Sequence, residues 1–442
     1  MLKTFKIGGV HPAENKLSAG KAIEQLPLPK TVTLMVAQHI GAPSKVVVNR
    51  GDEVKVGQIV AQSSGFVSTN IHSSVSGKVA KIDTVVDSSG YKKQAIVINV
   101  AGDEWDESID RTTDLVTDIN LDAKTINEKI LAAGIVGLGG ATFPTHVKLS
   151  PPPGMKAEVL LINGVECEPY LTADHRLMLE KGEEILVGTK ILMKALGVDK
   201  AVIGIENNKP DAIKHLSALA KKYQGIKVTP LKVKYPQGGE KQLIKAVTGR
   251  EVPSGALPIA VGAVVNNVGT AFAVYEAVTK NKPLIERVVT VTGKSVEAPS
   301  NFLVRIGTSV SQLIDAAGGL PDDTAKVISG GPMMGKAVSS IDIPVTKGTS
   351  GILIINEKEG HRKPIQNCIR CGRCVTACPM GLEPYLLMTL SEQKIWDKTE
   401  DERVMDCIEC GSCSYTCPAS RPLLDYIRYG KVTVGGIIRS RK

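Results

Sequence analysis

Eight of the nine cysteines in this chain of 442 residues lie in two matching runs, and this repeat constrains the fold more than any other feature. The two runs, each closed by a proline, are Cys368, Cys371, Cys374, Cys378 and Pro379, and Cys407, Cys410, Cys413, Cys417 and Pro418. Both follow the pattern C-x2-C-x2-C-x3-C-P, which is typical of chains that hold two [4Fe–4S] clusters. Gly372 and Gly411 take the same place in both runs, where a residue without a Cβ lets the backbone bend tightly.

In this pattern three closely spaced cysteines bind one cluster, and the fourth cysteine binds the other. The spacing therefore predicts two ligand sets, which are Cys368, Cys371, Cys374 with Cys417, and Cys407, Cys410, Cys413 with Cys378. A pair of structural zinc sites is the alternative, because zinc sites use similar C-x2-C pairs. Zinc needs only four ligands, which leaves the third cysteine and the proline of each run without a purpose, so the iron–sulfur interpretation is favoured.

Composition and charge exclude several classes of protein. Apolar residues make up 43% of the chain, and no apolar run approaches the roughly 20 residues of a membrane-spanning helix. Aromatic residues make up only 4% and no recognition motif is present, so we expect no nucleic-acid partner. The N-terminus lacks the apolar core of a signal peptide, and free thiolates suit a reducing compartment. The sequence therefore predicts a soluble or peripheral protein on the cytoplasmic side.

The last residues of the chain are strongly basic. After Pro418, one acidic residue, Asp425, stands against Arg421, Arg428, Lys431, Arg439, Arg441 and Lys442. Such a basic tail suits an anionic membrane surface or an acidic protein partner. A solvated, frayed C-terminus is the alternative.

Short alternating apolar runs separated by turn residues fill residues 31–100 and predict a small all-β module. The phrases at residues 51–61 and 73–79 resemble the lipoyl and biotinyl barrel-sandwich domain. The hairpin that carries a modified lysine in that family corresponds to residues 63–68, which contain no lysine. We therefore expect a structural or interacting module and not a swinging arm.

From about residue 122 to residue 282, apolar β runs alternate with helical periodicity, which predicts an α/β domain with a mostly parallel sheet. A glycine-rich loop spans residues 134–145, and glycine lets a backbone approach a phosphate closely. Polar segments at residues 163–169, 235–241 and 266–270 each follow a predicted strand. Ligands bind at such strand ends in α/β sheets, so these segments together predict a nucleotide pocket.

These motifs carry a resemblance to known families. The combination G-x-G-G-A-x-F-P-T-x-x-K, N-x-x-E-x-E-P, Y-x-x-G-x-E and N-N-V resembles the flavin subunit of NADH:quinone oxidoreductases. The whole chain is similar to the C-subunit family of Rnf-type ion-translocating ferredoxin:NAD oxidoreductases. This resemblance implies a multidomain α/β and α+β chain that carries FMN, NAD(H) and two [4Fe–4S] clusters.

The resemblance also divides the chain. It implies an N-terminal extension (1–30), a barrel-sandwich hybrid (31–102), a linker (103–121), an FMN- and NADH-binding α/β domain (122–284), a β-grasp (SLBB) module (285–358), a 2[4Fe–4S] ferredoxin-like domain (359–430) and the basic tail (431–442).

The family pattern further implies roles for individual residues. FMN is held by Gly137, Gly139 and Lys148, with Gly140 in the same loop, and its flavin receives hydrogen bonds from Asn163, Gly238, Asn266 and Asn267. On the NADH side, Phe143 stacks on the nucleotide, and the lining carboxylates are Glu166, Glu168 and Glu240. The chain departs from the flavin-subunit pattern at Val165, which replaces an aspartate, and at residues 250–253, which lack an aromatic. Both departures fall on the NADH side.

The combination of cofactors predicts the function. A nicotinamide exchanges two electrons as hydride and a cluster exchanges one, so a flavin must stand between them, and no catalytic protein side chain is required. We expect an enzyme subunit, a ferredoxin:NAD oxidoreductase component that binds other subunits and touches the membrane only peripherally, at its cytoplasmic face. The alternatives are a soluble microcompartment cobalamin reductase and a non-catalytic iron–sulfur scaffold.

Overall fold

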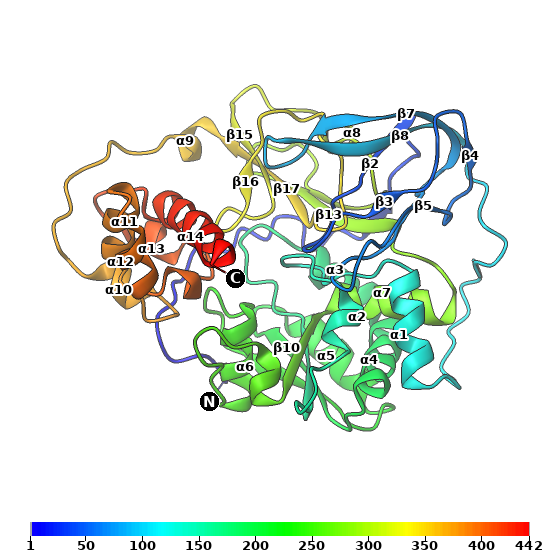
Figure 1. Ribbon diagram of the computed structural model, residues 1–442, viewed down its shortest axis with the longest axis horizontal. Helices are drawn as coiled ribbons and strands as arrows, with labels where there is room; N and C mark the ends of the chain where they lie inside the picture. The colour runs from blue at the N-terminus through cyan, green and yellow to red at the C-terminus, as the bar shows by residue number, and fades with distance from the viewer. Residues whose placement is uncertain (1, 442) are drawn as a thin grey trace.

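The computed structural model describes residues 2–441 and arranges them as four bodies (Figure 1). A central α/β domain lies below an all-β pair of modules, and the cysteine-rich domain lies to one side. Among the described residues, no helix combines the length and apolar character needed to cross a bilayer.

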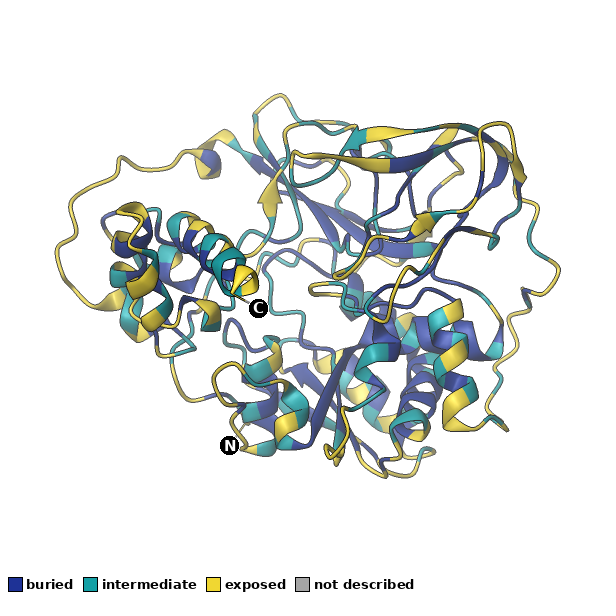
Figure 2. Cartoon of the chain, viewed as in Figure 1, coloured by how far each residue is buried: buried dark blue, intermediate teal, exposed yellow. Residues whose placement is uncertain are grey.

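The central α/β domain is built on a parallel sheet in the order β11-β10-β9-β12. Its strands are β9 (Val159–Asn163), β10 (Ala201–Glu206), β11 (Ile226–Leu231) and β12 (Ala263–Asn267). Helices of this domain are α1 (Ala123–Ala132), α3 (Ala173–Glu180), α4 (Gly182–Leu196), α5 (Pro210–Ala220), α6 (Glu240–Thr248) and α7 (Val268–Thr279). Strands β9, β10 and β12 are almost entirely buried because helices cover both faces of a parallel sheet, whereas the edge strand β11 is partly exposed (Figure 2).

Local sequence signals explain several boundaries in this domain. The side chain of Asp122 accepts a hydrogen bond from the Thr125 N–H and caps α1. Helix α4 ends at Gly197, whose φ of +66° lies in the left-handed region that glycine tolerates. The predicted α/β alternation is therefore confirmed.

The barrel-sandwich module consists of two antiparallel sheets. The larger sheet contains β2 (Thr31–Met35), β8 (Lys92–Gly102), β7 (Ser76–Val86) and β4 (Glu53–Val54), and the smaller contains β3 (Lys45–Val46), β5 (Ile59–Gln62) and β6 (Ile71–His72). Alternating apolar residues such as Val32, Leu34, Ile96 and Ile98 are fully buried between them.

The β-grasp region forms part of a six-stranded sheet in the order β1-β14-β13-β17-β15-β16. Its strands are β1 (Ile23–Gln25), β13 (Glu286–Thr292), β14 (Ser300–Arg305), β15 (Thr324–Ser329), β16 (Lys336–Ala337) and β17 (Gly351–Asn356), with α8 (Val310–Ala316) packed on them. Strand β1 comes from the N-terminal extension and pairs in parallel with β14. The extension, whose glycines and prolines predict irregular structure, therefore supplies an edge strand.

The N-terminal extension also joins two domains. The Gly9 N–H donates to the Ala377 carbonyl at 2.9 Å, and Val10 exchanges backbone hydrogen bonds with Tyr235 at 2.8 and 2.9 Å. Further along, the Lys16 ammonium donates to the carbonyls of Glu166, Glu168 and Leu171. The extension thus lies as a strap between the cysteine-rich domain and the central α/β domain.

The cysteine-rich domain is helical. It contains α10 (Arg373–Ala377), α11 (Pro384–Glu392), α12 (Trp396–Asp401), α13 (Ser412–Thr416) and α14 (Leu423–Ser440). Of the residues expected as a basic tail, 431–440 form the second half of α14 and Lys442 lies outside the described residues. Two of the tail's charges are paired within the chain. Lys431 pairs with Glu409 at 3.1 Å, and Arg441 pairs with Glu400 at 2.8 Å.

Candidate functional site: a nucleotide cleft beside two cysteine pockets

The glycine-rich loop and the ends of β9 and β12 meet, as the sequence predicts. The loop is closed by a hydrogen bond of 2.8 Å from the Gly137 N–H to the Phe143 carbonyl. Gly139 has a φ of +70°, and a Cβ on it would lie 2.9 Å from the Asn267 amide nitrogen. Only glycine combines that backbone conformation with such close packing. Gly140 is exposed beside it, on the open side of the loop.

Asn266 is the clearest sign of a ligand in this cleft. Its side chain is only 2% exposed, and neither its amide nitrogen nor its amide oxygen has a hydrogen-bond partner. Leaving a buried amide unpaired costs roughly 1–3 kcal/mol for each polar atom, so such groups are normally satisfied. A flavin, whose ring carries both donors and acceptors, fits this pair of free atoms.

Lys148 supplies the positive charge of the cleft. It lies at the end of the short helix α2 (Thr145–Lys148), which begins directly after the glycine-rich loop. Its ammonium donates to the Val265 carbonyl at 3.0 Å and pairs with Glu240 at 2.9 Å. An ammonium held beside the glycine-rich loop suits a phosphate group.

Two other predicted flavin contacts are engaged within the protein. The Asn163 amide donates to the Gly238 carbonyl at 2.8 Å, and its oxygen accepts the Val165 N–H at 3.1 Å. Asn267 caps α7 by accepting the Gly269 N–H at 2.7 Å and donates to Asp174 at 2.7 Å. These residues order the walls of the cleft, and their direct contact with flavin stays a prediction.

Two of the three carboxylates predicted for the NADH side, Glu166 and Glu168, are also engaged within the protein, and the third, Glu240, pairs with Lys148. Glu166 accepts hydrogen bonds from the N–H groups of Asp174 and His175 at the start of α3, at 2.8 and 3.1 Å. Glu168 accepts from the N–H groups of Met333 and Met334, at 3.1 and 2.8 Å. Burial raises the pKa of Glu168 to about 7. Both side chains thus stabilise backbone segments of the protein, and their contact with NADH stays a prediction.

The structure brings together one complete predicted set of cluster ligands. Cys378, Cys407, Cys410 and Cys413 line a single cavity whose remaining wall includes Leu387, Leu424 and Ile427. Burial raises the pKa of Cys413 to about 12 and that of Cys407 to about 11. Within residues 2–441, no three His, Cys, Asp or Glu side chains gather as ligands of a single metal ion. A cavity walled by four cysteines and apolar side chains fits an iron–sulfur cluster. We call it the inner cysteine pocket.

The other predicted set is only partly assembled. Cys374 and Cys417 are half-buried and neighbour each other, whereas Cys368 and Cys371 are exposed. The two exposed cysteines lie on the segment between α9 (Glu357–Gly360) and α10, which is yellow at the left of Figure 2. We call this set the outer cysteine group.

Two hydrogen bonds join the nucleotide cleft to the inner cysteine pocket, and the N-terminal extension adds a third contact with that pocket. The Tyr235 hydroxyl donates to the Cys410 carbonyl at 2.8 Å. Gln242 of α6 donates to the Pro379 carbonyl at 3.3 Å. Gly8 comes so close that a Cβ on it would lie 2.4 Å from the Cys378 carbonyl carbon. Sequence reasoning placed Tyr235 in a nucleotide motif but gave no signal that it reaches the cysteines.

Comparison with known proteins gives a consistent picture. Four family models match in order: the RnfC barrel sandwich hybrid domain at residues 3–103, the Nuo51 FMN-binding domain at 130–276, the SLBB domain at 288–337 and the 4Fe-4S dicluster domain at 362–418. The fold and site thus define a chain that joins an FMN-binding domain to a pair of [4Fe–4S] clusters. The predicted FMN, the two clusters and the fold class are confirmed.

Relatives that match over nearly the full length of this chain show to which family within this class it belongs. The C subunit of the proton-translocating ferredoxin:NAD(+) oxidoreductase complex of Clostridium ljungdahlii is 51% identical over 98% of this chain and 94% of its own length. The Na(+)-translocating counterpart of Acetobacterium woodii is 47% identical over 97% of this chain and 96% of its own. This chain belongs to the RnfC family, the C subunits of ion-translocating ferredoxin:NAD(+) oxidoreductase complexes.

A solved structure shares part of the fold. A chain of an NAD+-reducing [NiFe]-hydrogenase in the air-oxidized state aligns with 71% of this chain and 66% of its own length, at a TM-score of 0.50 and 17% identity. At that identity the likeness concerns the fold alone.

Proposed function

We propose that this chain is the peripheral electron-transfer subunit of a membrane-bound ion-translocating complex. It exchanges hydride with NAD(H) and passes single electrons through two [4Fe–4S] clusters to or from the other subunits. The FMN-binding and dicluster domains and the names of the full-length relatives support this function. The finding that no described helix can span a bilayer fits peripheral association, which we place at the cytoplasmic face.

Within the cleft, the residues of this chain bind and orient the flavin. Bound FMN supplies the conversion between two-electron and one-electron transfer. Asn266 offers a buried donor and acceptor, Lys148 offers a positive charge, and Gly139 keeps the loop close to the strand ends. The clusters are then held by the inner cysteine pocket and the outer cysteine group.

The hydrogen bond from Tyr235 to Cys410 is the observation that carries the proposal. It connects a loop of the nucleotide cleft with a cysteine of the inner pocket, which supports the following order of electron transfer. The inner pocket holds the cluster next to the flavin. The outer group, with Cys368 and Cys371 exposed, holds the cluster that meets the partner.

The segment around the outer cysteines has the charge expected of a docking surface. Its exposed basic residues are Lys358, Arg362, Lys363, Arg370 and Arg373. Arg362 pairs with Asp425 at 2.8 Å, and none of the remaining four forms an ion pair with a described residue. A basic rim of this kind steers an acidic redox partner toward the exposed cluster.

An anaerobic titration with NADH tests the proposal. The purified protein should contain about eight iron atoms per chain and non-covalent flavin, and NADH should bleach the flavin absorbance. Flavin that stays oxidised in NADH would contradict the proposal.

A non-catalytic iron–sulfur scaffold is the second candidate. It is favoured by the finding that the carboxylates of Glu166 and Glu168, predicted to line the NADH side, both accept hydrogen bonds from backbone N–H groups instead. The same titration separates the two, since a scaffold would bind iron and leave its flavin unreduced.

A further inference from the structure

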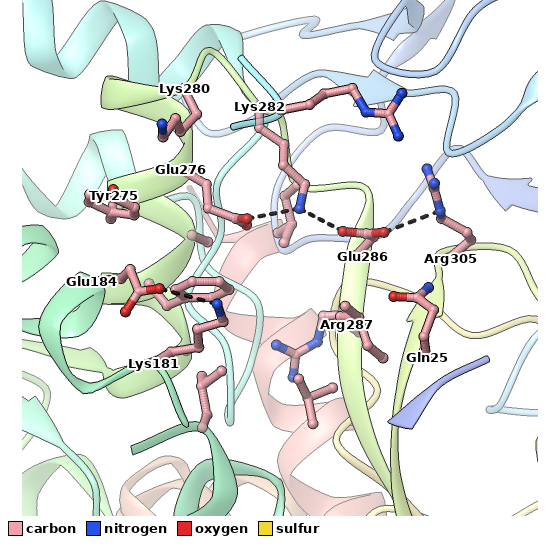
Figure 3. Close-up of a pocket in the computed structure, with 18 of the residues that line it drawn as sticks. Gln25, Lys181, Glu184, Tyr275, Glu276, Lys280, Lys282, Glu286, Arg287 and Arg305 are labelled. Atoms are coloured by element: carbon pink, nitrogen blue, oxygen red, sulfur yellow. Dashed lines mark hydrogen bonds and ion pairs between the residues drawn. The ribbon is translucent and has the colours of Figure 1, made fainter. Parts of the chain in front are cut away.

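Beside the nucleotide cleft and the cysteine pockets, the chain contains a partly open cavity of about 610 Å³. Its walls are the helices α3, α4 and α7, the strands β13 and β14 of the six-stranded sheet, and residues 103–114 of the linker (Figure 3). Small-molecule sites in proteins span roughly 300–1,000 Å³, so this cavity has the size of a ligand site.

Most charged side chains in these walls are paired with one another. Lys282 links Glu276 and Glu286 at 2.8 and 2.6 Å, as the dashed lines in Figure 3 show. The other pairs are Arg305 with Asp103 at 2.7 Å, Lys280 with Asp110 at 2.7 Å, and Lys181 with Glu184 at 3.2 Å. These charges are satisfied without any ligand.

Arg287 of β13 is different. The residue is only 7% exposed, and its Nε donates to the Thr349 carbonyl at 3.3 Å. No carboxylate of residues 2–441 lies within 4.0 Å of its guanidinium, and its terminal nitrogens make no hydrogen bond to the described chain. Figure 3 shows the guanidinium in the cavity with no dashed line to it. The terminal nitrogens of the guanidinium, whose planar arrangement suits a carboxylate or phosphate, therefore face the cavity without a hydrogen-bond partner in the described chain.

Leaving this charge without a counter-ion is unfavourable. A buried guanidinium loses its hydration, and burial lowers the pKa of Arg287 to about 10. The nearest compensating charge is Asp174, but its carboxylate already accepts the Asn267 amide at 2.7 Å. Burial and the neighbouring Glu166 also raise the pKa of Asp174 to about 6. Asp174 is thus an incomplete counter-ion.

A helix start adds to the positive field at the same place. Gly269, in the first turn of α7, lines the cavity, and a Cβ on it would lie 3.6 Å from an Nη atom of Arg287. The first N–H groups of a helix carry a partial positive charge that attracts anions. The Gly269 N–H already donates to Asn267, so the start of α7 contributes the field of its dipole at this place and not a free N–H of Gly269.

Part of the wall near α7 is apolar. Leu177, Phe272 and Leu303 line the cavity on three different elements. Leu138 of the glycine-rich loop lines it as well, and its N–H donates to the Thr270 hydroxyl at 2.9 Å. The cavity thus lies against the back of the loop that shapes the nucleotide cleft.

We propose that this cavity is a binding site for a small organic anion, with its phosphate or carboxylate on Arg287 and the start of α7 and a flat apolar body against Phe272 and Leu177. The site adjoins the nucleotide cleft at Leu138 and Gly269, and the proposal does not depend on the direction or partner of electron transfer.

Calorimetric titration of the flavin- and cluster-loaded protein, in a buffer free of phosphate, tests this site with phenyl phosphate, benzoate, inorganic phosphate and phenol. Phenyl phosphate or benzoate should bind saturably at one site per chain, and more tightly than either inorganic phosphate or phenol. The comparison of phenyl phosphate with benzoate shows whether the head group is a phosphate or a carboxylate. Saturating NAD+ should leave this affinity unchanged.

Substitutions in the cavity wall test which residue binds the anion. Arg287→Gln should weaken binding of the preferred anion by about tenfold or more, since hydrogen bonds to a charged group are lost. Arg287→Lys keeps the positive charge but lacks the planar pair of donors. Its affinity for the anion should lie between those of the wild type and Arg287→Gln. Phe272→Ala should weaken phenyl phosphate but not inorganic phosphate. Arg111→Gln is the matched control, because Arg111 lines the same cavity but is 59% exposed and lies over the Trp105 ring.

The proposal is overturned if no probe binds the wild-type protein saturably, which would make the cavity a water-filled gap between modules. It is also overturned if Arg287→Gln, with unchanged flavin and iron content, binds as tightly as the wild type. Equal losses in Arg287→Gln and Arg111→Gln would show a general charge effect and would likewise exclude an anion site at Arg287.

Discussion

The hydroxyl of Tyr235 donates a hydrogen bond of 2.8 Å to the carbonyl oxygen of Cys410. Tyr235 belongs to the loop after β11 that carries Gly238 and Glu240 of the nucleotide cleft, and Cys410 belongs to the inner cysteine pocket. The two residues are 175 positions apart in the chain and buried together. This side chain is therefore one of the direct contacts, with Gln242 and the N-terminal strap, that hold the nucleotide cleft beside the inner pocket.

Tyr235→Phe removes this hydrogen bond and keeps the ring. A donor near a cluster ligand stabilises the reduced, more negative state, so its loss should lower the reduction potential of the inner cluster. A net hydrogen bond contributes about 1 kcal/mol, which corresponds to about 40 mV for one electron. Potentiometric EPR checks this shift. An unchanged potential with full iron content would show that the contact only packs the domains together.

Asn266→Ala should weaken flavin binding. Both polar atoms of the Asn266 side chain are buried and unpaired, so we expect them to be satisfied by the flavin. Losing hydrogen bonds worth about 1–3 kcal/mol should lower flavin affinity by about 5- to 150-fold. Flavin retained after gel filtration measures the effect, and Asn99→Ala, on the exposed side of β8, is the control. Equal flavin retention in the two variants would place the flavin elsewhere.

Lys363→Glu should slow electron transfer to the partner but not the reduction of flavin by NADH. Lys363 is exposed in the basic segment beside the outer cysteine group, and like charges across an interface slow association. Stopped-flow transfer to an acidic two-cluster ferredoxin, measured at rising salt, reports the effect. Lys92→Glu, an equally exposed lysine on β8, controls for net charge. If both variants slow transfer equally, the basic segment is not the docking surface.

Lys347 gives a prediction about pH. This fully buried residue donates to the carbonyls of Asn70 and Gly134, at 2.7 Å each, and so joins the barrel-sandwich module to the central α/β domain. Burial lowers its pKa to about 7 from 10.5. Between these values the unfolded chain binds more protons than the folded chain, so stability should rise with pH from about 7 to about 10.5.

Lys347→Met should remove that rise and lower the melting temperature at pH 9, because two buried carbonyls lose their donor. Melting curves of wild type and variant across this pH range measure the slope. Lys358→Met, at an exposed position, should keep the wild-type slope. A wild-type slope in Lys347→Met would show that other groups set the pH dependence.

Much of this fold follows from local sequence signals. The cysteine spacing predicted that Cys378 crosses over to the second run, and the structure places Cys378 with Cys407, Cys410 and Cys413. Period-2 and helical patterns predicted the α/β alternation and the all-β module, because burial on one or both faces leaves a periodic trace in the sequence.

The N-terminal strap and the contacts between domains have no such periodic pattern in the sequence. Residues 1–30 contain glycines and prolines at irregular spacing, which predict irregular structure, yet β1 pairs with β14 and Val10 pairs with Tyr235. The hydrogen bonds that Glu166 and Glu168 accept from backbone N–H groups could likewise not be predicted from the sequence. Their partners lie on other elements, and sequence patterns carry no information about which distant N–H group a carboxylate will meet.

Freeze-quench EPR after mixing the anaerobic protein with NADH tests the central claim, the order from flavin to inner pocket to outer group, most directly. In Cys371→Ala, which removes an outer ligand, NADH should still reduce the flavin and the inner cluster. In Cys410→Ala, flavin should be reduced and the outer cluster should stay oxidised on the same timescale. Rapid reduction of the outer cluster in Cys410→Ala, with loss of inner-cluster reduction in Cys371→Ala, would contradict the account.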